Sequence, residues 1–217
     1  LGDVYKRQAE AVLAVKSVLV DLNDAAATLP NSYNSVENIT PLETPLSSTI
    51  NGAALATPVF LSLYAENDLR LDKYFAETDE KGFRKNKKAG SNNYLCTFRV
   101  GEIYLTAAEA AARLGELSQA RTRLLELMRK RYAPEAYEAK SVVVNAMDKE
   151  ALVQEILDER ARELAFEGHR WFDLRRSTRP RLEKVLDGTR YVLEENDARY
   201  TLAIPKEAIE ANPGLLN

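Results

Sequence analysis

Charged residues lie inside an apolar helical stripe between residues 149 and 167, and this combination constrains the fold more than any other feature. Arg160 falls near the centre of the stripe when each residue advances by about 100°, and Glu163 and Glu167 lie beside it. Asp148 suits an N-cap and Gly168 suits a C-terminal stop, so we predict one helix from Lys149 to Glu167. The apolar residues of the stripe are Val153, Ile156, Leu157, Ala161 and Leu164.

Charges placed in an interior cost several kcal/mol each unless they pair and form hydrogen bonds. We therefore expect Arg160 to find carboxylates and Glu167 to find a donor such as Arg170, whereas Arg162 lies on the opposite, exposed face of the helix. The segment is thus predicted to form a buried ion network that fixes the helix against the following residues. Its predicted members are Arg160, Glu163, Glu167, Arg170 and Asp173.

A catalytic role for these carboxylates is a weaker hypothesis. A glycosidase acid and base flank the sugar from two sides, about 5 to 9 Å apart, and two glutamates one turn apart on one helix cannot enclose a substrate in this way. His169, the only histidine, has no recognisable nucleophile as a partner. Trp171 and Phe172 are expected to be buried in the core rather than to bind sugar, and no catalytic residue is predicted.

Composition excludes several classes of function. The net charge of −3, from 30 basic and 33 acidic residues, gives no field that would attract nucleic acid. No run of 18 apolar residues is present, so no membrane-spanning helix is predicted. A single cysteine, Cys96, and a single histidine exclude an intrachain disulfide and leave too few ligands for zinc. We therefore expect no metal and no cofactor.

The start of the sequence indicates a piece of a longer protein, because the chain opens with Leu1 and its two methionines are internal. Residues 1–8, LGDVYKRQ, resemble translated adapter sequence and are interpreted as a non-native segment. An ordinary helix start is the alternative. The remaining residues, 9–217, are expected to form the C-terminal portion of one domain.

This portion divides into three parts. Residues 9–98 are loop-rich: a helix is predicted over 9–22, residues 66–75 are predicted to form a turn and then an extended segment, and residues 81–93 are predicted to form a solvated basic loop. Residues 99–131 contain two amphipathic runs. Residues 132–217 hold the charged helix and a C-terminal tail.

The two amphipathic runs predict an antiparallel helix pair over about 101–114 and 118–131. Gly115 suits the C-terminal stop of the first helix, and Ser118 suits the cap of the second. The small residues of AARLGELSQARTRLLEL are typical of a tetratricopeptide repeat, in which paired helices approach closely.

Four segments together resemble one protein family. R-x-x-E-L-A-F-E-G-x-R-W-F-D-L-R-R, at residues 160–176, is similar to the C-terminal signature of the SusD/RagB family of glycan-binding outer-membrane lipoproteins. NDLRLDKYF (67–75), RVGEIYLTAAEAAARLGE (99–116) and LAIPKEAIEANPGLLN (202–217) resemble further family segments in the same order. The resemblance covers about residues 60–217. Leu69 replaces the usual proline, and the tail ends at Asn217 where the family often continues.

The resemblance implies an all-α fold of tetratricopeptide-like helix pairs with long irregular loop regions. It implies a surface-exposed lipoprotein of the outer membrane that binds oligosaccharide or polysaccharide and delivers it to a SusC-like TonB-dependent transporter. Membrane association would then come only from a lipid anchor outside these residues. A tetratricopeptide-type protein-interaction scaffold and, more weakly, a glycoside hydrolase remain alternatives.

Sugar contacts are predicted to come from the loop-rich part. Pyranose rings bury their C–H faces against exposed aromatic rings, and nearby polar groups fix their hydroxyls. Four tyrosines in that part lie among Asn, Asp and Arg residues, and the alternative for each is that it covers the helical core. These candidate ligand-binding residues are Tyr33, Tyr64, Tyr74 and Tyr94.

Overall fold

The computed structural model describes residues 2–42, 55–88, 96–186, 188–212 and 214. The chain forms two compact units, which divide between Arg170 and Trp171. The first unit contains a helical frame and the loop-rich part, and the second contains a hairpin and short helices.

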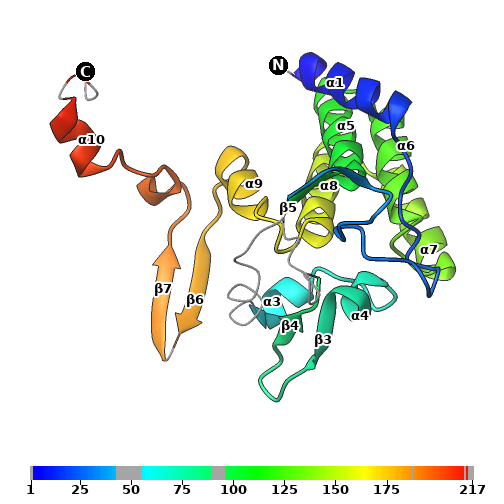
Figure 1. Ribbon diagram of the computed structural model, residues 1–217, viewed down its shortest axis with the longest axis horizontal. Coiled ribbons are helices and arrows are strands. Elements are labelled where there is room, and N and C mark those ends of the chain that lie inside the picture. The colour runs from blue at the N-terminus through cyan, green and yellow to red at the C-terminus, as the bar shows by residue number, and fades with distance from the viewer. Residues whose placement is uncertain (1, 43–54, 89–95, 187, 213, 215–217) are drawn as a thin grey trace. The chain divides into compact units, whose positions relative to one another are not determined.

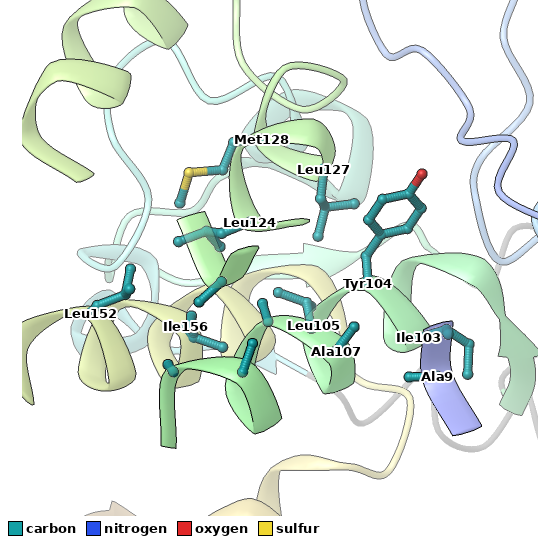
Figure 2. Close-up of a cluster of buried hydrophobic side chains, with 14 of the residues drawn as sticks. Ala9, Ile103, Tyr104, Leu105, Ala107, Leu124, Leu127, Met128, Leu152 and Ile156 are labelled. Atoms are coloured by element: carbon teal, nitrogen blue, oxygen red, sulfur yellow. The ribbon is translucent and has the colours of Figure 1, made fainter. Parts of the chain in front are cut away.

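The helical frame is built around α5 (Val100–Leu114), which packs against α1 (Gly2–Val15), α6 (Leu117–Met128) and α8 (Lys149–Glu163) (Figure 1). The next helix, α7 (Pro134–Ala146), packs against α6. The alanines of α5 are buried, and their small side chains let the neighbouring helices approach α5 closely. Larger side chains close the core between them (Figure 2), including Leu105, Leu124, Leu127, Met128, Leu152 and Ile156.

The predicted helix pair is confirmed. Gly115 ends α5 in the left-handed conformation at φ 84°, and the N–H of Glu116 bonds the carbonyl of Ala111. This arrangement reverses the chain within two residues. The prediction that Ser118 caps the second helix was wrong, because α6 already begins at Leu117 and Ser118 is its second residue.

The first helix differs from the one predicted over residues 9–22. It begins at Gly2 and ends at Val15, so it includes most of the segment that resembles adapter sequence. Further along the predicted range, backbone groups bond other parts of the chain instead of the helix. The N–H of Val20 donates to Glu37 at 2.9 Å, and its carbonyl accepts from Arg131 at 2.6 Å.

Short strands organise the loop-rich part. One antiparallel ribbon joins β1 (Asn38–Leu42) to β5 (Cys96–Arg99), and a three-stranded sheet has the order β2-β4-β3. These elements and the short helices beside them are small, as expected for a region rich in proline and polar residues. Their bounds are β2 Leu55–Ala56, α3 Pro58–Leu61, α4 Arg70–Tyr74, β3 Phe75–Thr78 and β4 Arg84–Asn86.

The segment NDLRLDKYF forms one helical turn, α4, and becomes extended only at Phe75. The prediction of a turn followed directly by an extended segment was therefore only partly right. The cause lies in Asp68, whose carboxylate accepts from the N–H and the guanidinium of Arg70 and so organises the first turn. The loop-rich part also contributes to an aromatic cluster whose rings pack edge to face; its members are Phe60, Tyr64, Phe75 and Phe166.

Helix α8 ends at Glu163, four residues before the predicted end. The chain then turns through Phe166, which has φ 61°, and Gly168, which has φ 86°. The carbonyls of Glu163 and Ala165 accept hydrogen bonds from the buried ammonium of Lys88. The Lys88 ammonium thus satisfies carbonyls that the end of a helix leaves without a partner inside the helix.

The second unit follows α9 (Arg170–Arg176) with an antiparallel hairpin of β6 (Leu182–Leu186) and β7 (Thr189–Leu193). Trp171 stacks on Tyr200 with ring centroids 5.2 Å apart. Phe172 is 63% exposed, so its predicted burial was wrong: the short α9 turns Asp173 and Leu174 inward and leaves Phe172 on its other side. The tail contains a 3-10 turn, Ala198–Tyr200, and α10, Lys206–Ala211.

Candidate functional site

Glu163, in the last turn of α8, is fully buried and lies at the centre of an ion network. Its Oε1 accepts from Arg99 Nη1 at 2.6 Å and from Arg131 Nη2 at 3.0 Å. Its Oε2 accepts from Arg131 Nε at 2.9 Å and from Arg70 Nη1 at 3.1 Å. One carboxylate thus holds three arginines.

The three arginines come from separate parts of the chain. Arg70 opens α4, Arg99 ends β5, and Arg131 lies in the turn after α6. All three guanidinium groups are fully buried. The network therefore ties the loop-rich part to two helices of the frame.

Glu37 supplies a second buried carboxylate, from the loop before β1. It accepts from Arg99 Nη1 at 3.1 Å and from Arg131 Nη2 at 2.5 Å. It also accepts from the backbone N–H groups of Val20 and Gly101. Because it bonds four groups at once, Glu37 fixes the segments at residues 20 and 37 against the start of α5.

Glu167 is buried, as predicted, but its partners differ from the prediction. Arg99 donates to both of its oxygens, at 2.8 and 2.9 Å, and the ammonium of Lys88 makes a further short contact. Arg170, the predicted donor, is exposed. The turn after Glu163 directs Glu167 back toward β5, away from the position that a continuous helix would have given it.

An outer branch of the network runs along α8. Glu159 accepts from Arg70 at 2.7 Å and from Arg162 at 2.8 Å, and Arg162 also donates to Glu155 at 2.5 Å. Arg162 is buried, which corrects the prediction that it lies on an exposed face. The loop-rich part covers this side of α8, because the carbonyl of Leu63 accepts from Arg162.

The network is balanced in charge. Among the residues that the structure describes, it links six cations to six carboxylates through ion pairs of 3.3 Å or less. The cations are Arg70, Lys88, Arg99, Arg131, Lys140 and Arg162. The carboxylates are Glu37, Asp68, Glu155, Glu159, Glu163 and Glu167.

The remaining predicted members lie apart from this set. Arg160 is buried, as predicted, and its guanidinium lies 3.4 Å from Thr106 Oγ1 and 4.0 Å from Glu102. His169 lies 3.5 Å from the same carboxylate. Asp173 is buried in the second unit and pairs with Arg176 at 2.7 Å.

The charged partners determine the protonation of the buried carboxylates. Burial alone would raise the pKa of Glu163, but Arg131, Arg99 and Arg70 together hold it well below its usual value. The same balance lowers the pKa of Glu159 to about 2. Burial also lowers the pKa of Lys88 to about 8, against the attraction of Glu167. Glu159 and Glu163 are thus fixed negative charges at neutral pH.

The candidate tyrosines divide into exposed and buried residues. Tyr33 is 52% exposed. Tyr64 is buried and donates to the carbonyl of Arg162 at 2.8 Å, and Tyr74 is fully buried beneath Lys88. The predicted exposure of Tyr64 and Tyr74 was therefore wrong, because both pack under the ion network. Tyr94 lies outside the described residues.

Sequence reasoning missed all three arginine partners of Glu163. Arg70 and Arg99 lie inside segments with a recognisable pattern, and Arg131 follows α6 at a position where the buried face continues, so these arginines carried a signal. Glu37 and Lys88 lie in irregular segments without periodicity. No sequence pattern separates such loop residues from solvated ones.

Fold and network together define a class: a helical scaffold with a tetratricopeptide-like pair, to which a loop-rich part is tied by buried ion pairs. The model of the SusD family matches residues 55–217, which is most of the chain, so the protein belongs to the SusD family. Comparison with curated proteins gave no match. Within the described ranges no group of three metal-ligating side chains occurs, and no helix there is long and apolar enough to cross a bilayer.

Three solved structures share the fold. A SusD superfamily protein from Bacteroides thetaiotaomicron matches with a TM-score of 0.70 and 21% identity, over 97% of this chain and 56% of its own. A SusD-like carbohydrate binding protein from Bacteroides vulgatus matches with a TM-score of 0.66 and 18% identity, over 96% of this chain and 54% of its own. A SusD superfamily protein from Bacteroides fragilis matches with a TM-score of 0.63 and 22% identity, over 98% of this chain and 54% of its own. The chain spans about half the length of these proteins.

Proposed function

We propose that this protein binds glycan as the surface component of an outer-membrane uptake system and delivers oligosaccharide to a SusC-like TonB-dependent transporter. Membership of the SusD family, over residues 55–217, carries the proposal. The structural relative from Bacteroides vulgatus is described as a carbohydrate binding protein, which supports the same class of ligand.

The state of the buried carboxylates supports binding without hydrolysis. A glycosidase needs a general acid whose pKa is raised toward neutrality and which can reach the scissile bond. In Glu163 and Glu167 the pKa is lowered, and both side chains are buried and paired with Arg99. Neither can donate a proton to a bound sugar.

Of the three predicted tyrosines that the structure describes, Tyr33 is the exposed one, and it is our candidate sugar contact. Asn38 donates from Nδ2 to the carbonyls of Ser32 and Tyr33, at 2.5 and 2.6 Å. These bonds hold the backbone of the loop, and the residue itself is half-exposed. A fixed loop with an accessible ring suits stacking against a pyranose.

Affinity gel electrophoresis of the complete protein tests the proposal. Amylopectin, inulin, arabinoxylan and yeast mannan are each cast into a native gel, and albumin serves as the non-binding control. We expect at least one polysaccharide to retard the protein, with no new reducing ends after prolonged incubation. Retardation by none of the four, or release of reducing ends, would contradict the proposal.

The transporter partner needs a separate test. The complete protein is expressed with a SusC-like TonB-dependent transporter from the same organism, and the membrane fraction is purified through a tag on the transporter. We expect the two proteins to copurify in stoichiometric amounts. Recovery of the transporter alone would remove this part of the proposal and leave glycan binding intact.

A further inference from the structure

Phe98 is an exposed aromatic residue on a strand whose next residue is locked in the interior. It lies in β5 and is 43% exposed, whereas Arg99 is fully buried. Successive side chains of a strand point to opposite faces. One face of β5 is thus anchored in the ion network, and the other presents the ring of Phe98 to solvent.

Thr40 stands directly across from Phe98 on the neighbouring strand. The register of the ribbon pairs Thr40 with Phe98, and both side chains are exposed. Opposite residues of an antiparallel pair have Cβ atoms about 4.5 to 5.5 Å apart. An apolar ring and a hydroxyl that can both donate and accept therefore lie side by side on one face.

The backbone beneath this pair is held in place by the network. Among the described residues Arg99 donates five hydrogen bonds, to Glu37, Glu163 and Glu167. The N–H of Val100 donates to the carbonyl of Glu37 at 2.9 Å. Both strands of the ribbon are thus anchored on the side away from Phe98. Such preorganisation reduces the loss of entropy when a ligand binds.

We propose that Phe98 and Thr40 form a contact site for one pyranose unit of the glycan. The ring of Phe98 packs against the apolar C–H face of the sugar, and the hydroxyl of Thr40 bonds one of its hydroxyls. The inference rests on the proposed function and adds a named contact outside the predicted tyrosines. It also connects the ion network with the proposed site, because the buried Arg99 directly follows Phe98 on β5.

Substitutions on the ribbon test the inference in the complete protein, with the same four polysaccharides and affinity measured from gel retardation. Phe98→Ala removes the stacking surface and is expected to weaken binding roughly five- to tenfold. Phe98→Trp keeps a ring and is expected to stay within about threefold of the original protein. Thr40→Val removes only the hydroxyl, and we expect a loss of about threefold. The control is Tyr191→Ala, which removes an exposed ring from β7.

The outcomes separate this inference from the proposed function. If the original protein binds and Phe98→Ala binds equally well, the inference is wrong and the proposed function stands. If Tyr191→Ala loses as much affinity as Phe98→Ala, the contact is not specific to the ribbon, and the inference also fails. If the original protein binds none of the polysaccharides, both fail. If Phe98→Ala lowers the melting temperature, the affinity of Phe98→Leu, which keeps apolar bulk but lacks the ring, is measured in its place. Binding equal to that of the original protein then contradicts the inference.

Discussion

Glu163 accepts hydrogen bonds from three arginines that lie far apart in the sequence. Taking one such carboxylate from water costs several kcal/mol, and the three guanidinium groups recover that cost only while all of them stay in place. A buried charge that loses its partner destabilises the fold far more than a surface charge does. The position of Glu163 is therefore sensitive to substitution.

Glu163→Ala is expected to reduce the free energy of unfolding by about 3 to 5 kcal/mol, because it leaves three buried arginines without their shared partner. Urea denaturation monitored by circular dichroism measures the change. Glu183→Ala is the matched control, since Glu183 pairs with Arg190 on the exposed hairpin. We expect the control to unfold at the same urea concentration as the original protein. A loss below about 0.5 kcal/mol in Glu163→Ala would mean that the network contributes little.

Acid should weaken the network in a defined window. The pKa of Glu159 is about 2 in the folded protein and 4.5 in its ordinary state. A lowered pKa contributes stability that is complete above 4.5 and is lost as the pH falls toward 2. Melting temperatures of the original protein and of Glu159→Gln should therefore converge between pH 5 and about 2. A difference that stays constant across this range would show that Glu159 does not titrate as described.

At the scale of elements, the start of α5 is packed against the network. A Cβ atom added at Gly101 would lie 2.5 Å from Arg99 Nη1, 3.0 Å from Glu37 Oε2 and 3.1 Å from Glu163 Oε1. Such approaches are closer than van der Waals contact allows. The absence of a side chain at this position is therefore a requirement of the network and not of the helix itself.

Gly101→Ala should reverse the usual effect of alanine in a helix. Alanine normally stabilises a helical position relative to glycine by up to about 1 kcal/mol. Here we expect a loss of about 1 to 3 kcal/mol, because the buried groups must move apart. Thermal unfolding measures it, with Gly2→Ala as control, since a Cβ there meets Leu114 at an ordinary 3.6 Å. Equal or higher stability of Gly101→Ala would contradict the described packing.

The elements that could be predicted from the sequence are those with a strong period. The pair α5 and α6 carries regular apolar spacing and Gly115, and it was predicted nearly to its ends. The ends of α1 and α8 were misplaced by several residues. In both cases buried side chains bond the backbone where the helix would have continued. Such tertiary partners leave no trace in local spacing.

The candidate site shows the same limit. Burial of Arg160 and Glu163 followed from helical phase, whereas Glu167 is buried beyond the end of α8, where the turn after Glu163 places it. The partners of Glu163 and Glu167 did not follow from helical phase, and one of them, Lys88, lies in an irregular segment. Tyr64 and Tyr74 were candidate sugar contacts because they lie among polar residues, with coverage of the core as the alternative. In the fold the network covers them, and only three-dimensional packing reveals this.

In the molecule as a whole, the first unit divides into a helical frame and a loop-rich part. Periodic helices form the frame, and aperiodic segments form the part proposed to meet the glycan. The network spans both through Arg70, Arg99 and Arg131. We infer that the charged signature supports the proposed glycan-binding surface and is not itself a binding site.

Hydrogen–deuterium exchange of Glu163→Gln, read by mass spectrometry, tests this claim most directly. Removing one charge from α8 should speed exchange in distant segments, namely around residues 20, 37–40, 70–75 and 98–100, because their anchors meet at Glu163 and Glu37. Peptides from the core of α5 and α6, such as residues 105–112, should keep their protection. Faster exchange confined to the end of α8 would contradict the claim that this network joins the loop-rich part to the frame.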